Sequence, residues 1–211
     1  MAGVEDHTSC AAAVQSDLLS FSVWAVPPPD SPLPKRLGGV ISRLAQTYGT
    51  PVFEPHVTIS GGIRAKSEED VVAAFKELCA GLAPFNCRAV DVAAGTSFFQ
   101  CVYLLIAKSP EIVKTHLQTR RWFGLLDQQQ RQEEAQAAEA YMPHLSLIYG
   151  SLSEEDREAA VRRIVTEWDD LVVTTEFPVT SLCLYSTEGV DLSLTNWHKV
   201  AEIPLQGKPP M

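Results

Sequence analysis

Two short stretches of the chain share one alternation of apolar and polar positions. Residues 56–59 read His-Val-Thr-Ile, and residues 144–147 read His-Leu-Ser-Leu. A period of two is typical of a β-strand, in which successive side chains point to opposite faces. Each stretch therefore predicts a strand that carries an imidazole and a hydroxyl on one face and two apolar side chains on the other.

Helical patterns flank both stretches and extend the repeat. Ser67 and Ser153 are each followed by three acidic residues, which is the expected start of a helix because serine caps its first N–H groups and carboxylates suit its positive end. Apolar residues at helical spacing follow each serine, and similar stripes precede each histidine. Further strands are expected near residues 20–26, 87–93, 98–107, 171–184 and 196–203.

Each half of the chain thus reads strand, helix, histidine strand, helix, strand. We predict an α+β fold made of two lobes related by a pseudo-two-fold axis, with antiparallel sheets lining a central cleft and helices outside. One domain is expected over residues 20–206, with lobes near 20–96 and 97–206 that could exchange strands. Residues 1–19 are expected to form a flexible tail.

The duplication places two imidazoles and two hydroxyls in one predicted cleft. One imidazole can take a proton from water while the other protonates a leaving oxygen, and hydroxyls can donate to the charge that develops on a phosphate. The alternative is a pair of buried histidines on two core strands. Because both copies share their flanking residues, the pattern favours a phosphate site.

At this point the sequence resembles a known family. The paired His-x-Thr/Ser motifs are typical of the 2H phosphoesterases, the two-histidine, LigT-like superfamily. The longer strings around them resemble the plant- and yeast-type cyclic phosphodiesterases. The resemblance spans about residues 20–206 and rests on residues 22–27, 55–59, 95–102 and 141–149.

The resemblance implies hydrolysis of ADP-ribose 1'',2''-cyclic phosphate and nucleoside 2',3'-cyclic phosphates after tRNA splicing. It implies no metal and no other cofactor. The sequence agrees with this, because no group of Asp, Glu, His or Cys has the spacing of a metal site.

Seven residues are candidates for the site. The catalytic pair is His56 and His144; the resemblance implies His144 as base and His56 as acid, a choice that the nearly symmetric motif leaves open. Thr58 and Ser146 are expected to hold the phosphate, and the resemblance adds Tyr149. The duplication aligns Trp24 with Tyr103, and we expect the two aromatic rings to flank the cleft.

Composition restricts the partners. A net charge of −9 over 211 residues argues against a long nucleic-acid footprint, which needs Lys and Arg. No apolar run reaches the length of a membrane span, and the first basic residue is Lys35, so we expect neither membrane insertion nor a targeting peptide. The resemblance implies a small cyclic-phosphate nucleotide as the ligand, and a monomer and a cytoplasmic location are also expected.

The five cysteines are expected to be reduced, with Cys101 and Cys183 as small core residues, although the sequence leaves a disulfide open. Residues 127–140 are rich in Gln, Glu and Ala and form a longer link than we expect in the family. They predict either a solvated extension of the preceding helix or a lid near the cleft.

Two other functions remain open from the sequence. One is an RNA-end-processing 2H enzyme, either a 2',3'-cyclic phosphate RNA phosphodiesterase or an exonuclease. The other is a nucleotide-binding module without catalysis, which the two intact motifs make less favourable.

Overall fold

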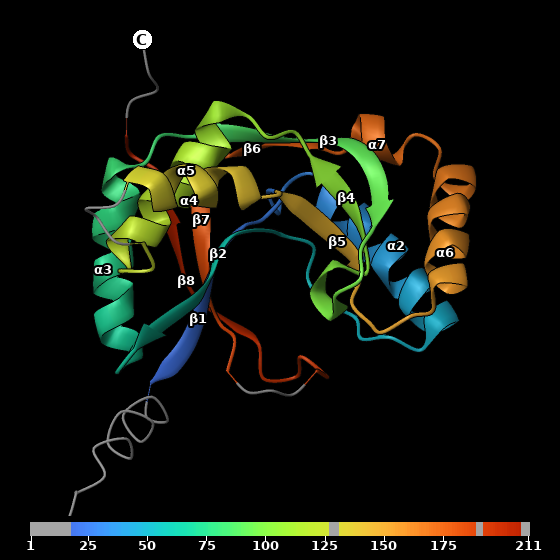
Figure 1. Ribbon diagram of the computed structural model, residues 1–211, viewed down its shortest axis with the longest axis horizontal. Coiled ribbons are helices and arrows are strands. Elements are labelled where there is room, and N and C mark those ends of the chain that lie inside the picture. The colour runs from blue at the N-terminus through green and yellow to red at the C-terminus, as the bar shows by residue number, and fades with distance from the viewer. Residues whose placement is uncertain (1–17, 127–130, 189–191, 208–211) are drawn as a thin grey trace, which may run out of the picture.

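The computed structural model describes residues 18–126, 131–188 and 192–207 (Figure 1). Strands and helices alternate along most of the chain. The elements are β1 (Leu19–Ala25), α2 (Leu33–Tyr48), β2 (Val57–Ala65), α3 (Glu68–Gly81), β3 (Phe85–Ala94), the 3-10 helix η1 (Phe98–Gln100), β4 (Val102–Ile106), α4 (Pro110–Trp122), α5 (Arg131–Ala140), β5 (His144–Ile148), α6 (Glu154–Glu167), α7 (Leu171–Thr174), β6 (Glu176–Val179), β7 (Ser181–Ser186) and β8 (His198–Pro204).

The strands pair in the order β6-β3-β4-β5-β2-β1-β7-β8, and every neighbouring pair is antiparallel. The order divides into two groups of four strands. These groups meet at β2 and β5, where a single residue pair, Val57 with Leu145, joins them. The two histidine strands therefore lie side by side at the centre, as the α+β prediction of antiparallel sheets around a cleft requires.

Strands from both halves of the sequence enter each group. β3, from the first half of the chain, pairs with β4, and β7, from the second half, pairs with β1. The chain crosses from one group to the other at Thr180, because β6 pairs with β3 whereas β7 pairs with β1. A cut of the chain at residue 96 therefore does not separate the two groups of strands.

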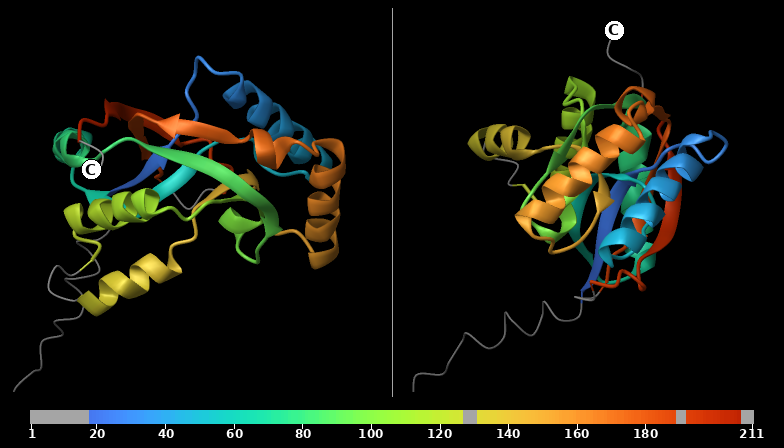
Figure 2. Two further views of the ribbon diagram at one scale, coloured as in Figure 1. Left: turned by 90° about the horizontal axis from the view of Figure 1, so that it is seen from above. Right: turned by 90° about the vertical axis from the view of Figure 1, so that its right-hand side faces the viewer.

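Helices cover the outside of the two groups (Figures 1 and 2). α2 packs on β5 and α4 packs on β2, so each histidine strand is covered by a helix from the other half of the sequence. α3 packs on β8 and β7, and α6 packs on β3 and β4. The apolar face predicted for the histidine strands is buried, with Ile59 and Leu145 fully inaccessible to solvent.

The predicted helix starts are confirmed. The Ser67 hydroxyl accepts from the Asp70 N–H, and the Ser153 hydroxyl accepts from the Asp156 N–H. Each serine thus satisfies one N–H group that has no partner within its helix.

Two of the predicted strands are interrupted. The run 98–107 begins with η1, and only Val102–Ile106 is strand. The run 171–184 is not one strand: it contains α7, β6 and β7. The β-branched residues of this run favour a strand locally. Leu171 is instead fully buried as the first residue of the short helix α7. β6 and β7 are separate strands, because the chain crosses from one group to the other at Thr180.

The Gln/Glu/Ala-rich segment does not extend the helix before it. α4 ends at Trp122, and Gly124 follows with a φ of 66°, which does not continue a right-handed helix. Residues 131–140 form the separate helix α5, which packs on α4 and forms an ion pair between Arg121 and Glu134. Residues 127–130 lie outside the described part of the chain.

Within the described ranges, no helix combines the length and the apolar character needed to cross a membrane. Cys79, Cys87, Cys101 and Cys183 are buried free thiols, which confirms the prediction of Cys101 and Cys183 as core residues. Cys10 and the tail predicted for residues 1–19 lie outside the description, except for residues 18 and 19.

Candidate active site

The two motif histidines are held in the same way. His56 immediately precedes β2, and its Nδ1 lies 2.7 Å from the carbonyl oxygen of Glu54. His144 begins β5, and its Nδ1 lies 2.8 Å from the carbonyl oxygen of Met142. A carbonyl oxygen can only accept, so Nδ1 of each ring carries the proton and donates it. The Nε2 atom of each neutral imidazole is then left to take a proton or, once protonated, to give one.

The histidines share one cleft of about 550 Å³, whose wall combines aromatic, hydroxyl and glycine residues from both halves of the chain. The lining residues are Ser22, Trp24, His56, Thr58, Gly61, Gly62, Ser97, Phe99, Gln100, His144, Tyr149, Thr187 and Trp197. Its size and its mixed lining are typical of a site for a small organic ligand.

His56 lies deep in this cleft, with 3% of its surface exposed. Its ring stacks on Trp24, and its Nε2 lies 3.2 Å from the Tyr149 hydroxyl, which donates to the neutral ring. Burial lowers the pKa of His56 from 6.5 to about 4; the hydrogen bond to Glu54 opposes this shift, and the charge of His144 adds to it. The free protein therefore holds His56 neutral at pH 7.

His144 is less enclosed than His56. Its ring lies 5.1 Å from the ring of Tyr103, at a tilt of 59°. Burial lowers the pKa of His144 below its ordinary value, while the backbone carbonyls of Met142 and Phe99 act to raise it. Both imidazoles are thus neutral near pH 7 in the free protein.

The two motif hydroxyls differ in their surroundings. Thr58 lines the cleft, and its hydroxyl makes no hydrogen bond within the part of the chain that the structure describes. Ser146 is buried, and its hydroxyl donates to the carbonyl oxygen of Phe99 at 3.0 Å. Ser146 follows His144 by two residues, so the two share one face of β5. Ser146 is nevertheless not among the residues that line the cleft.

The aligned aromatic residues Trp24 and Tyr103 occupy equivalent places in the sheet. Trp24 pairs with Thr58 across β1 and β2, and Tyr103 pairs with Ser146 across β4 and β5. Their surroundings are not equivalent. Trp24 lines the cleft, whereas Tyr103 does not, and the Tyr103 hydroxyl instead donates to the sulfur of Met142 at 3.8 Å. The structure therefore brings Trp24, but not Tyr103, to the wall of the cleft.

Tyr149 follows the end of β5, so strand alternation does not fix its direction. Its side chain lines the cleft, stacks on Phe53 with ring centroids 3.9 Å apart, and reaches His56. Burial raises the pKa of the Tyr149 hydroxyl far above its ordinary value, so the hydroxyl keeps its proton.

Several residues of the cleft carried no signal in the sequence. Trp197 precedes β8 and lies 5.6 Å from Trp24 between ring centroids, although it is far from either motif in the sequence. Phe99 stacks on Trp197 at 5.8 Å. The strings that carry the family resemblance include Phe99 but not Trp197. The sequence indicated Trp197 only as a residue of the strand expected near 196–203, and the structure places it just before β8.

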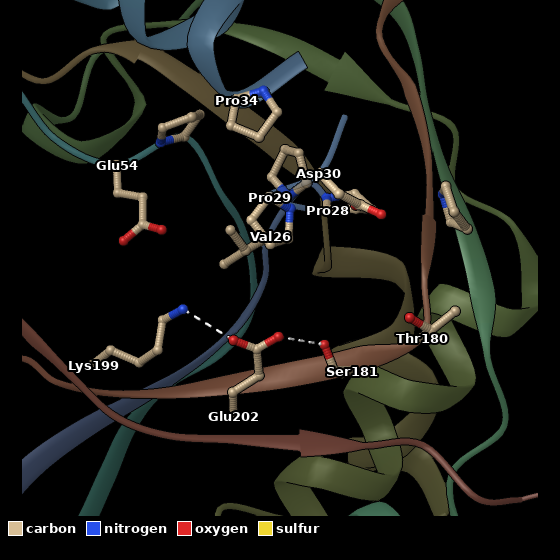
Figure 3. A pocket seen from close by; sticks show the side chains of 13 residues that line it. Val26, Pro28, Pro29, Asp30, Pro34, Glu54, Thr180, Ser181, Lys199 and Glu202 are labelled. Carbon is tan, nitrogen blue, oxygen red and sulfur yellow. Dashed lines mark hydrogen bonds and ion pairs between the residues drawn. The ribbon is translucent and has the colours of Figure 1, made fainter. Parts of the chain in front are cut away.

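A separate pocket of about 230 Å³ lies beside β7 and β8, and Glu54 is in its wall (Figure 3). Here Glu202 accepts hydrogen bonds from Lys199 at 3.0 Å and from Ser181 at 2.9 Å. This pocket contains neither motif histidine. Glu54 links it to the cleft, because its carboxylate accepts from the Tyr185 hydroxyl while its carbonyl accepts from His56.

The described residues contain no group of three or more His, Cys, Asp or Glu side chains arranged to hold a metal ion. The side chains that line the cleft bring together two imidazoles, the hydroxyls of Ser22, Thr58, Ser97, Tyr149 and Thr187, and the aromatic rings of Trp24, Phe99 and Trp197.

Solved structures share the fold. E. coli LigT, crystallised with 3'-AMP, is 15% identical and matches with a TM-score of 0.53 over 90% of this chain and 98% of its own. A protein of Thermus thermophilus is 14% identical, with a TM-score of 0.54 over 90% of this chain and 100% of its own. At these identities the likeness concerns the fold.

Sequence relatives are more specific. A cyclic phosphodiesterase of Arabidopsis thaliana is 30% identical over 181 residues, which cover 86% of this chain and 92% of that protein. A 2',3'-cyclic-nucleotide 3'-phosphodiesterase of Yarrowia lipolytica is 28% identical over 182 residues, covering 72% and 82%. The family model described as "Cyclic phosphodiesterase-like protein" matches residues 19–203, and the chain accordingly belongs to the cyclic phosphodiesterase-like family.

Proposed function

We propose that this enzyme hydrolyses small cyclic phosphodiesters, namely ADP-ribose 1'',2''-cyclic phosphate and nucleoside 2',3'-cyclic phosphates, to phosphomonoesters. The observation that carries the proposal is the matched pair His56 and His144. Nδ1 of each ring is bonded to a backbone carbonyl, and both rings line the same cleft. The names of the Arabidopsis and Yarrowia relatives support this substrate class.

In the proposed reaction one neutral imidazole takes a proton from water as the water oxygen forms a new bond to phosphorus. The bond between phosphorus and one ribose oxygen breaks, and the other, protonated imidazole gives its proton to that oxygen. The products are a phosphomonoester and a free ribose hydroxyl, and the pair of histidines retains one proton in total. Following the resemblance, His144 acts as base and His56 as acid.

The low pKa of His56 has a consequence for this assignment. His56 is neutral in the free protein at pH 7, so it can act as an acid only after the substrate raises its pKa. A bound phosphate diester does this, because a nearby negative charge favours the protonated imidazole. The flat face of Trp24 against the ring favours the cation as well.

The other candidate residues bind the substrate or support the residues that do. Thr58 donates to a non-bridging phosphate oxygen, and Ser146 does so after its hydroxyl turns from the Phe99 carbonyl. Tyr149, whose hydroxyl keeps its proton, assists from the side of His56. Trp24 shields the reacting phosphate from bulk water, and Tyr103 supports the ring of His144 from outside the cleft.

The reaction needs no metal in this proposal, because both proton transfers and the phosphate contacts come from side chains. One chain supplies both histidines, so the enzyme acts as a monomer. By the resemblance, its cyclic substrates arise after tRNA splicing in the cytoplasm.

Product analysis tests the proposed function. The purified protein is incubated with ADP-ribose 1'',2''-cyclic phosphate, with the four nucleoside 2',3'-cyclic phosphates and with an oligonucleotide that ends in a 2',3'-cyclic phosphate. Conversion of the small substrates to phosphomonoesters, with slower turnover of the oligonucleotide end, is expected. Turnover of the oligonucleotide alone would instead indicate an RNA-end-processing enzyme, and the identity of the product isomer shows which ring bond breaks.

A further inference from the structure

A second cavity, of about 370 Å³, adjoins the histidine cleft on the side of α4 and α5. The two share Thr58, Gly61, Gln100 and His144, so they meet at β2 and at one of the motif histidines. The far wall of the second cavity is different in character, because it contains the cationic Arg120 and the imidazole of His116. None of the described residues that line it is acidic.

Arg120 is the main reason to examine this cavity. Its Nη2 donates to the Leu125 carbonyl at 3.2 Å, but its Nε is buried without a hydrogen-bond partner. No carboxylate of the described residues pairs with it, whereas the next residue, Arg121, pairs with Glu134. Arg120 thus lines the cavity as a cation without a carboxylate partner among the described residues, and its planar guanidinium suits a phosphate that can accept from two of its nitrogens.

His116 adds a second polar group to the same wall, with 7% of its surface exposed. Its Nδ1 lies 2.6 Å from the Ile59 carbonyl, and its ring stacks on Tyr141, whose hydroxyl donates to the Thr58 carbonyl at 3.0 Å. These contacts hold β2 beside the cavity. They leave Nε2 of His116 without a hydrogen bond to any described residue.

We propose that this cavity binds a second phosphate of the substrate, one carried by the sugar that bears the cyclic phosphate, and that Arg120 is the residue that selects for it. The proposal rests on the function proposed above. The 5'-phosphate of a nucleotide and the pyrophosphate of ADP-ribose present the same chemistry to Arg120. A cyclic phosphate that carries either group contacts both the histidine cleft and the second cavity, whereas a plain nucleoside 2',3'-cyclic phosphate contacts the cleft alone.

Steady-state kinetics with three substrates tests the proposal. The substrates are adenosine 2',3'-cyclic phosphate, the same compound with a 5'-phosphate, and ADP-ribose 1'',2''-cyclic phosphate. Arg120→Gln should lower kcat/KM roughly 10- to 100-fold for the two substrates with a second phosphate, mainly through KM, since a charge-assisted contact is lost. The plain nucleoside substrate should be unaffected, and Arg120→Lys should recover part of the loss.

Lys114→Gln is the matched control. Lys114 also lies on α4 and is exposed, and it lines a different pocket, so its replacement removes the same charge without touching the second cavity. Thermal unfolding of both variants shows whether the fold is retained. Equal loss of kcat/KM on all three substrates in Arg120→Gln, or no loss on any of them, would overturn the proposal.

Failure of the proposed function would be recognised separately, as a wild-type protein that hydrolyses none of the three compounds. The cavity would then be examined by calorimetric titration with inorganic pyrophosphate. Binding that weakens at least about tenfold in Arg120→Gln, but not in Lys114→Gln, supports an anion subsite. Equal binding by both variants, or none by the wild type, refutes it.

Discussion

Trp24 lies face to face with His56, with ring centroids 3.6 Å apart and planes inclined by 6°. The opposite contact of the indole is Tyr185, whose ring centroid lies 3.8 Å away, and the indole N–H donates to the Ser22 hydroxyl at 2.7 Å. Tyr185 and Ser22 hold the indole in place, and the indole in turn restricts the plane of the His56 imidazole that stacks on it.

Replacement of Trp24 should therefore disturb the chemistry more than the fold. Trp24→Ala is expected to lower kcat by roughly 100-fold, since a misplaced catalytic group loses about that much. Trp24→Phe keeps a flat ring and should lose much less. Nucleotide product added to the wild type should change the tryptophan fluorescence, and this response should shrink in Trp24→Phe. An unchanged response together with wild-type kinetics in that variant would make Trp24 a core residue.

The two histidines should depend on one another. His56→Ala and His144→Ala are each expected to lower kcat by roughly 10²- to 10⁴-fold, and the double variant should be little worse than either, because both groups act in one proton-transfer step. Rates are measured on a nucleoside 2',3'-cyclic phosphate, with circular dichroism as the control for folding. A single variant that kept more than about a tenth of the wild-type rate would contradict the acid–base pair.

The pH dependence of kcat/KM should be bell-shaped with its maximum on the acid side of pH 6.5. Burial lowers the pKa of both His56 and His144 in the free protein, to about 4 for His56. The pair works with one proton in total, and that form is most abundant between the two pKa values. Raising the pH through the higher pKa removes the acid's proton, so kcat/KM should fall. A profile that is flat up to pH 8 would exclude this pair as the titrating groups.

The two hydroxyls should contribute unequally. Thr58→Val is expected to lower kcat by roughly 100-fold, because Thr58 lines the cleft and its hydroxyl is proposed to donate to the developing charge. Ser146→Ala should cost about tenfold, since the Ser146 hydroxyl must first leave the Phe99 carbonyl. The comparison of kcat for the two variants on one substrate decides this order, and an equal or larger loss in Ser146→Ala would reverse it.

Activity should survive exhaustive dialysis against a chelator. The described residues contain no cluster of metal-ligating side chains, and a metal on either histidine would compete with the proton that the reaction needs there. The rate before and after EDTA treatment is the measurement. Loss of activity that a divalent ion restores would require a different mechanism.

Local sequence patterns were sufficient for the elements that carry the motifs. The alternation at residues 56–59 and 144–147 predicts which side chains face the core, and Ile59 and Leu145 are indeed fully buried. Ser67 and Ser153 predict the starts of α3 and α6, because a cap depends on the next three residues alone. The alignment of Trp24 with Tyr103 by duplication is also kept, since each pairs with the hydroxyl residue of its own motif.

The tertiary structure decided what depends on contacts between distant parts of the chain. The crossing at Thr180 sends β7 to β1 and separates it from β6, which no local pattern in residues 171–184 indicates. Trp24 lines the cleft and Tyr103 does not, although their positions in the sheet match. The Tyr103 hydroxyl contacts the sulfur of Met142 instead. The sequence by itself predicted the two histidine strands and which of their side chains face the core. Only packing placed Thr58, but not Ser146, in the wall of the cleft, lowered the pKa of both histidines and formed the adjoining cavity at Arg120, because burial and charge at a site are set by residues that the chain brings together from far apart.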